Sequence, residues 1–229
     1  MTQYLLVPAC HQFSSVGDDR LMAPESQQLF KQKVESLITN TSLVLCEGFQ
    51  NAELVDRTHP KYHLLHDRHV VLPEHVQPIF GGFDFRQQNK KTLSDYDAEM
   101  ARYDLWDDFV KEHLRTDPGQ QPCSLAEVIE IAKTPPTTRF DRTLTADEIA
   151  LARWVRFNFR KFDRLYLEAM HRIGRRFKLC FFIGGAAHVV AMALKSGYPV
   201  AETVPGEELL DVLDSYLASY YWTTLALQN

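Results

Sequence analysis

The amino-acid sequence predicts an α/β fold, with a mostly parallel sheet built from two βαβ halves and a helical insertion in the middle. Short apolar runs of strand length occur at 4–10, 42–49 and 179–185. A segment with helical spacing follows the first and the last of these runs, and a strand–helix–strand order implies parallel strands joined by right-handed crossovers. The stretch from about 88 to 176 has mostly helical patterns, which places the insertion there.

The N-terminal half begins with the run YLLVPAC (4–10), which is typical of a buried strand. A loop is expected over 14–23, and a helix is expected to start at Pro24, because proline suits the first helical position. Apolar residues recur with helical spacing as far as Ile38, and the run SLVLCEGF (42–49) is expected to form the second buried strand.

The middle of the chain contains one further predicted strand and three predicted helices. The strand VQPIFGGFDFR (76–86) is interrupted by two glycines. Helical spacing follows over 94–115, over 124–132 and from about 145 to 176. The second and third of these helices each open with a Ser/Thr-x-x-Glu capping box, in which two side chains satisfy backbone N–H groups at the helix start.

The C-terminal half repeats the order of the first. The strand LCFFIGG (179–185) precedes a helix that is expected to end at Gly197. The run YPVAETV (198–204) is expected to be the last strand, and a terminal helix with inward-facing leucines is expected over 206–222.

Size and composition exclude several classes of protein. The 229 residues favour a single α/β domain over 1–229, with the helical insertion inside it. The net charge of −5 gives no general attraction for nucleic acid, so no nucleic-acid partner is expected. No apolar run approaches the roughly 18–20 residues that a membrane crossing needs, and the N-terminus lacks the pattern of a signal peptide. Both a monomer and a homo-oligomer stay open.

The cysteines indicate the compartment. None of the four belongs to a C-x-x-C pair, and three lie in apolar runs; they are Cys10, Cys46, Cys123 and Cys180. This pattern favours reduced, mostly buried thiols in a cytoplasmic protein over a disulfide framework or a thiolate zinc site.

Polar residues follow the predicted strands at their carboxyl ends, where open α/β sheets bind ligands. His11 follows the first strand, Glu47 ends the second, and His188 follows the strand at 179–185. Asp84 and Arg86 lie at the end of the run 76–86. We expect these five residues to converge on one edge of the sheet as a candidate catalytic site.

This set of residues suits hydrolysis. Two imidazoles and a carboxylate, from His11, Glu47 and His188, can hold a divalent ion such as manganese, cobalt or zinc and leave positions open for water. Without a metal, a histidine and the glutamate could activate water directly. Gly184 and Gly185 would let the backbone approach a substrate closely. A structural alternative stays open, in which each histidine only forms hydrogen bonds and Glu47 only caps a strand.

The pattern resembles a superfamily that groups TraB/Tiki-type proteins, erythromycin esterase-like hydrolases and ChaN-like haem-binding proteins. Its late G-x-x-H motif is matched by Gly185-Ala186-Ala187-His188, and its strand-terminal glutamate is matched by Glu47. The first motif reads Pro8-Ala9-Cys10-His11, with proline in place of glycine. The run GGFDFR resembles the G-F-D segment of the esterase-like members and would place Asp84.

The resemblance implies an α/β fold and hydrolysis of a peptide or an ester by water that a metal or a His/Glu pair activates. The substrate would be a small molecule or a peptide. Asp84 would orient a histidine or the water, and Arg86 would stabilise negative charge. The alternative is a non-enzymatic binding protein on the same scaffold, with haem, an anionic small molecule or a protein partner as its ligand.

A row of arginines marks the predicted helix at 146–176. They are Arg153, Arg156, Arg160 and Arg164. A basic, aromatic helix can bind phosphate or single-stranded nucleic acid, but we favour pairing of these arginines with the acidic segment 94–108. Arg153 or Arg156 could still reach the site and hold an anionic substrate. The histidine-rich segment 58–77 offers a second place for a metal or, more simply, a solvated loop.

Overall fold

The computed structural model describes residues 1–13, 20–47, 53–55, 79–83, 93–113, 121–135, 140 and 142–228. At 11–13, 20–21, 47, 53–55, 79–83, 93–100 and 161–162 it describes the backbone alone. The histidine-rich segment 58–77 lies outside the described residues.

The centre of the fold is a five-stranded sheet in the order β1-β7-β4-β6-β5. Its strands are β1 (Gln3–Ala9), β4 (Leu43–Glu47), β5 (Glu53–Val55), β6 (Ile79–Phe83) and β7 (Leu179–Gly185). The first four strands of that order are parallel, and β5 is antiparallel to β6. The predicted α/β fold with a mostly parallel sheet is therefore confirmed.

Helices make up most of the remaining described chain. They are α1 (Pro24–Lys33), α2 (Leu93–His113), α3 (Leu125–Lys133), α4 (Ala146–Gly174), α5 (Ala186–Ser196), α6 (Leu209–Tyr216) and α7 (Thr223–Ala226). Both predicted capping boxes start a helix: the Ser124 side chain accepts a hydrogen bond from the Glu127 backbone, and Thr145 and Glu148 cap each other reciprocally. Gly197 ends α5 at a φ of 69°, a conformation that favours glycine.

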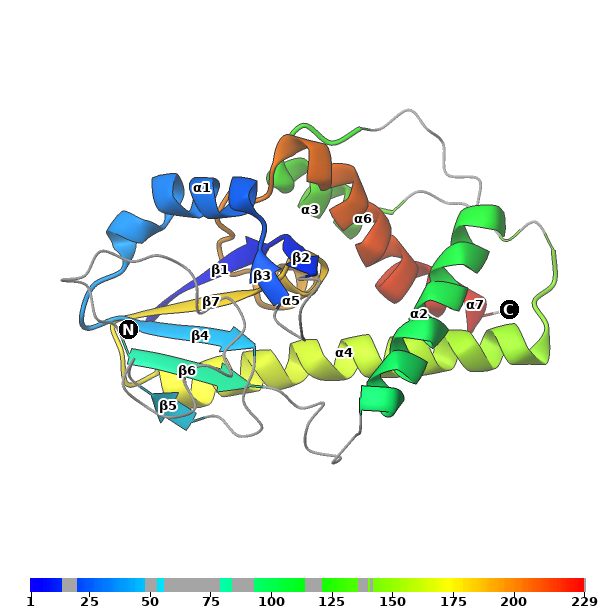
Figure 1. Cartoon of the computed structure of the whole chain (residues 1–229), viewed down its shortest axis with the longest axis horizontal. Coiled ribbons are helices and arrows are strands. Elements are labelled where there is room, and N and C mark those ends of the chain that lie inside the picture. Colours follow the sequence, from blue (N-terminus) through cyan, green and yellow to red (C-terminus); the bar gives the residue numbers. More distant parts are fainter. Residues whose placement is uncertain are drawn as a thin grey trace.

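Helices cover both faces of the sheet (Figure 1). Side chains alternate along β7, so that Phe181 and Ile183 pack with α1 while Cys180 and Phe182 pack with α4 and α5. A third cluster joins α2, α3, α4, α5 and α6 around Trp106 and Trp222. Of the helices in the predicted helical middle, α4 packs on one face of the sheet, and α2 and α3 pack against the neighbouring helices.

Several elements differ from the predictions. The expected last strand at 198–204 is reduced to a single bridge between Leu6 and Val200, because Pro199 and Pro8 each lack the N–H group that would extend the ladder on one side of the bridge. Three short strands were not predicted: β5, and the antiparallel pair β2 (His11–Phe13) and β3 (Arg20–Met22). The terminal helix changes at Leu217–Trp222 into a π-helix, η5.

Pro8 lies on the outer edge of the sheet. The Leu6 backbone N–H donates to the Pro199 carbonyl at 3.0 Å, and the Leu6 carbonyl accepts from Ala201 at 2.8 Å. The backbone N–H and C=O groups of Leu6, and of every second residue of β1 from it (the same parity), therefore point away from β7. Pro8 has the same parity, and its missing N–H therefore costs no hydrogen bond to β7. Its carbonyl accepts a hydrogen bond from Thr203 Oγ1 at 2.6 Å.

Candidate functional site

The carboxyl ends of the parallel strands meet at one edge of the sheet, as predicted. Ala9 is paired with Gly185, and Glu47 with Phe83. The backbone therefore places Glu47, the end of β6 and the start of α5 along the same edge, and His11 follows β1 as the first residue of β2. The side chains of His11 and Glu47 are not described, and Asp84 and Arg86 lie outside the described residues.

His188 lies in the first turn of α5, directly after β7. Gly184 and Gly185 end the strand, and Gly185 precedes the first helical residue, which confirms the predicted strand-to-helix turn. The His188 side chain is 19% exposed. His188 therefore lies at the sheet edge and also contacts residues inside the molecule.

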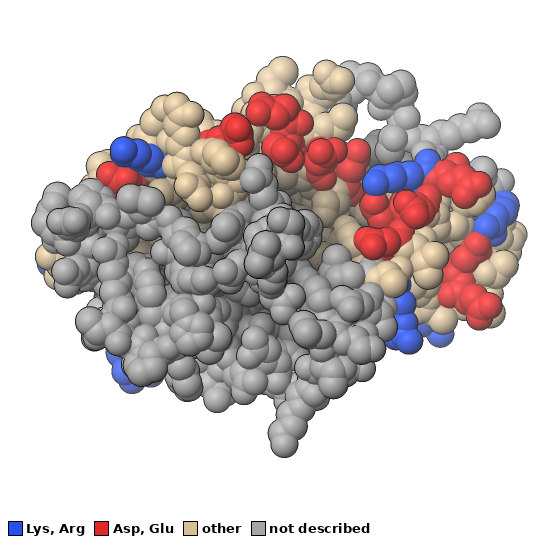
Figure 2. All heavy atoms as spheres, viewed as in Figure 1, with Lys and Arg blue, Asp and Glu red and all other residues tan. Residues whose placement is uncertain are grey.

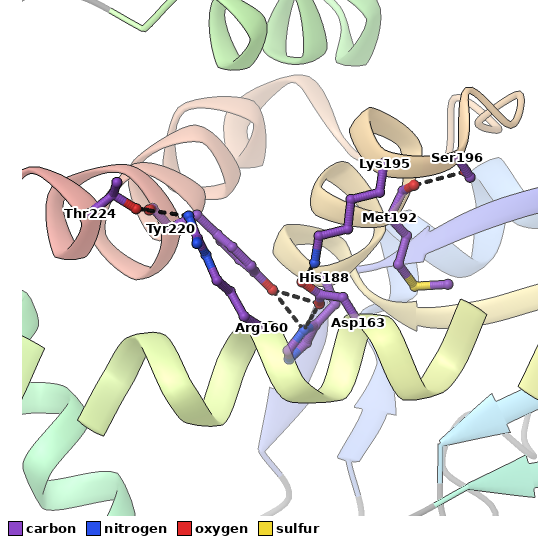
Figure 3. A network of polar contacts seen from close by, with 8 residues as sticks. All are labelled: Arg160, Asp163, His188, Met192, Lys195, Ser196, Tyr220 and Thr224. Carbon is purple, nitrogen blue, oxygen red and sulfur yellow. Dashed lines mark hydrogen bonds and ion pairs between the residues drawn. The ribbon is translucent and has the colours of Figure 1, made fainter. Parts of the chain in front are cut away.

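A buried carboxylate holds His188. The imidazole Nδ1 of His188 lies 2.8 Å from Oδ1 of Asp163, a residue of α4 whose side chain is 0% exposed (Figure 3). The Tyr220 hydroxyl donates to the same Asp163 oxygen at 2.6 Å and lies 3.1 Å from His188 Nδ1. Lys195 Nζ donates to Asp163 Oδ2 at 3.0 Å. We call these four side chains the Asp163 network.

The partners in the Asp163 network compensate the cost of burying a charge. A buried carboxylate is stable only when its lone pairs accept hydrogen bonds and a cation lies nearby. Tyr220 and His188 supply hydrogen bonds, and Lys195 supplies a positive charge. Burial, together with the negative charge of Asp163, raises the pKa of Tyr220 well above its ordinary value. Tyr220 therefore acts as a hydrogen-bond donor at neutral pH.

Aromatic rings fix the plane of the imidazole. The Phe159 ring is stacked on His188, with centroids 5.1 Å apart and an interplanar angle of 16°. Tyr166 meets the imidazole edge-on, at 6.1 Å and 89°. Phe159, Asp163 and Tyr166 are four and three residues apart, so one face of α4 supplies all three contacts.

The contact with Asp163 engages one of the two ring nitrogens of His188. Since Nδ1 is bonded to Asp163, any reaction or metal ligation by His188 would use Nε2. A carboxylate that orients the far nitrogen is common both to general-base histidines and to metal-binding histidines. Among the described residues, no group of three His, Cys, Asp or Glu side chains is arranged to hold a metal ion.

Sequence reasoning missed Asp163, Tyr220 and Lys195. One local signal existed for Asp163: it is the only acidic residue between Glu148 and Glu168, inside the basic, aromatic segment RKFDRLY. An isolated carboxylate among arginines and aromatic rings on a buried helix face favours a specific partner.

Arg153 and Arg156 lie elsewhere on α4, in an open groove of about 690 Å³. The groove is lined by Arg153, Arg156, Phe157, Arg160, Arg164, Leu165 and Leu227. The predicted pairing of these arginines with the acidic segment 94–108 is not observed among the described side chains, where no ion pair joins α4 to α2. Figure 2 shows acidic side chains gathered instead over α6 and α2, on the surface of the molecule.

Comparison with known proteins finds no matching family model, no similar curated protein and no similar solved structure. None of the helices in the described part of the chain combines the length and apolar character that a membrane crossing requires.

Proposed function

We propose that the protein is a hydrolase of the TraB/Tiki or erythromycin esterase-like type, which cleaves a peptide or ester bond with water activated at His188. The hydrogen bond between His188 Nδ1 and the buried Asp163 carboxylate supports this proposal most strongly. A carboxylate on Nδ1 orients the imidazole and favours the tautomer in which Nε2 is the basic nitrogen, and α/β folds bind ligands at this edge of the sheet.

In the proposed reaction, His188 Nε2 accepts a proton from water while the water oxygen attacks the carbonyl carbon of the substrate. The bond between that carbon and the leaving nitrogen or oxygen then breaks, and His188 returns the proton to the leaving atom. Asp163 accepts the hydrogen bond from Nδ1 and stabilises the imidazolium that forms between the two steps. Gly184 and Gly185 leave room for the substrate, Asp84 orients the water, and Arg86 stabilises the developing negative charge.

The same residues suit a divalent ion such as manganese, cobalt or zinc. His188, oriented by Asp163, would be one ligand, and His11 and Glu47 at the same edge of the sheet would be the others. Bound there, such an ion would lower the pKa of water toward neutrality. Elemental analysis of untagged protein after exposure to these ions tests this form of the proposal, since it requires bound metal that is lost in Glu47→Ala.

The test of the proposed function compares His188→Gln with the unaltered protein on a panel of fluorogenic peptides and nitrophenyl esters. General acid–base catalysis is worth about 10²- to 10⁴-fold, so His188→Gln should lose at least about 100-fold in kcat/KM while its circular dichroism stays unchanged. His171→Gln is the matched control, because His171 is an exposed histidine of α4 that is bonded to Tyr198. Unchanged turnover in a folded His188→Gln protein would refute the assignment.

A binding protein on the same scaffold is the second candidate. The stacked Phe159 and edge-on Tyr166 around His188 favour it, because flat apolar walls beside an imidazole also suit a planar ligand such as haem. Titration with haem separates the two candidates. A Soret shift that is lost in His188→Gln supports binding, and an unchanged spectrum excludes haem as the ligand.

We place the protein in the cytoplasm. Cys46 and Cys180 are buried, and burial raises the pKa of the Cys180 thiol to about 12, which keeps it protonated and unreactive. Thiol titration of the denatured protein tests this, because reduced cysteines would give four reactive thiols per chain.

A further inference from the structure

Among the described residues, the arginines of the α4 groove have fewer charge-compensating partners than Asp163 has in its network. Arg164 pairs only with the exposed Glu168, at 2.8 Å. Arg160 donates through Nη2 to the Thr224 hydroxyl at 2.8 Å (Figure 3), and no carboxylate in the described part of the chain accepts from it. Within the described part of the chain, neither Arg153 nor Arg156 forms an ion pair.

The arginines lie close enough to repel one another. Arg156 and Arg160 are one helical turn apart, and like charges at this spacing destabilise a helix. Burial and the neighbouring Arg156 both lower the pKa of Arg160. An anion between these two side chains would remove the repulsion, and the bond to Thr224 already holds Arg160 in place.

The rest of the groove is apolar. Phe157 lies between the arginines and is 63% exposed, and half-buried Leu165 and Leu227 line the groove with it. A volume of about 690 Å³ falls within the usual range for small-molecule sites. Arg153 and Arg164 are separated by about 16 Å along the helix at 1.5 Å per residue, so one phosphate could bridge only neighbouring arginines.

We infer that this groove binds an organic phosphate, with the phosphate between Arg156 and Arg160 and an apolar or aromatic body against Phe157. Guanidinium groups bind phosphate oxygens through paired N–H donors, and Arg153 adds long-range attraction. The Phe157 side chain is 63% exposed, so an apolar or aromatic group of the ligand can contact it. The inference does not rest on the proposed hydrolysis, because neither His188 nor Asp163 lines the groove.

Calorimetric titration of the full chain with 1-naphthyl phosphate, 1-naphthol and inorganic phosphate tests the inference. We expect 1-naphthyl phosphate to bind more tightly than the other two compounds. Arg156→Gln should raise its dissociation constant about 10- to 100-fold, the effect of losing hydrogen bonds to a charged group. Arg156→Lys should fall between the two, because lysine keeps the charge and loses the paired geometry.

Three further variants locate the ligand and separate this inference from the proposed hydrolysis. Arg172→Gln removes an exposed charge from the last turn of the same helix, outside the groove, and should leave binding unchanged. Phe157→Ala should weaken binding of 1-naphthyl phosphate and leave that of inorganic phosphate unchanged. His188→Gln should bind as the unaltered protein does, which separates a failure of this inference from a failure of the proposed hydrolysis.

Three outcomes would overturn the inference. One is a dissociation constant that Arg156→Gln does not change. Another is equal affinity for 1-naphthyl phosphate and inorganic phosphate, which would mean that the apolar part of the ligand contributes nothing to binding. The third is tighter binding of an oligothymidylate with a steep dependence on salt, which would assign the groove to single-stranded nucleic acid instead.

Discussion

Helix α4 carries two polar regions that differ in how their charges are compensated. In the Asp163 network, a fully buried carboxylate has hydrogen bonds from Tyr220 and His188 and an ion pair with Lys195. In the arginine groove, Arg164 is the one arginine of the four that forms an ion pair among the described residues, with the exposed Glu168. In the first region the buried charge is compensated inside the protein, whereas the second leaves its charges to solvent or to an anion.

This difference predicts which residues of α4 matter for the stability of the fold and which matter for ligand binding. Removing one partner from a buried ionic cluster leaves an uncompensated charge or unpaired donors, which is costly. Removing an exposed arginine costs little, because water already screens its charge. Loss of Asp163 or of the Tyr220 hydroxyl should therefore affect stability, and mutations in the groove should affect only ligand binding.

Asp163→Ala should have the largest effect. It leaves Tyr220 and Lys195 without their acceptor inside the molecule, so we expect a loss of about 3–5 kcal/mol in the free energy of unfolding. Urea denaturation measures it, with Glu168→Ala as the control, because that carboxylate forms an exposed pair on the same helix. Equal losses in the two variants would contradict the contrast between the regions.

Tyr220→Phe should have the next largest effect. It removes one hydrogen bond to a charged group, which is worth about 1.5–3 kcal/mol, and keeps the ring that packs against Phe159. Tyr221→Phe is the matched control, because this neighbouring tyrosine is only partly buried and lies outside the network. If both variants unfold at the same urea concentration, the Tyr220 hydroxyl contributes nothing to Asp163.

Glu148 should produce a smaller, pH-dependent effect at the start of α4. Hydrogen bonds from Arg142 lower its pKa from 4.5 to about 2. A carboxyl whose pKa is lower in the folded state stabilises the fold above its unfolded pKa, so this contribution is lost as pH falls from 4.5 toward 2. Because the pair is partly exposed, we expect less than about 1 kcal/mol.

Denaturation of the protein and of Glu148→Gln at several pH values between 7 and 2 measures this contribution. The stability difference between them should shrink as the pH falls through that window. A constant difference would show that Glu148 stabilises the helix by packing. Glu148→Gln also removes the acid-dependent stability that Glu148 gives to α4. The Asp163 network and the arginine groove can then be compared at low pH without that contribution.

Arg153→Ala combined with Arg156→Ala should have the smallest effect on stability, within about 0.5 kcal/mol. Loss of like-charge repulsion could even stabilise the protein at low salt, and this gain should vanish at high salt. Melting curves at the two salt concentrations measure it. A loss as large as that of Tyr220→Phe would mean that these arginines support the fold.

Local patterns predicted most of the fold. Apolar runs located β1, β4, β6 and β7, and the capping boxes located the starts of α3 and α4. Elements that depend on distant partners were not predicted. The three-residue strands β2, β3 and β5 are too short for a periodic signal, and Pro199 and Pro8 reduce the expected last strand to one bridge.

The candidate site divides in the same way. The sheet order places the carboxyl ends of β1, β4, β6 and β7 at one edge, as the βαβ order predicted, whereas the convergence of the five candidate side chains stays a prediction. The partner of His188 could not be found by spacing, because Asp163 and Tyr220 come from α4 and from a π-helix that only tertiary packing brings together. Helical periodicity did predict the arginine row, since it depends on one helix alone.

Pro8 has a consequence for the behaviour of the protein at high concentration. A sheet edge with unpaired N–H groups is a template on which another chain can add a strand, which leads to aggregation. Beyond Leu6, the β1 edge offers no such template, because Pro8 has no N–H group and its carbonyl is already bonded to Thr203. The proline that departs from the glycine of the resembled motif thus also protects this edge of the sheet against polymerisation.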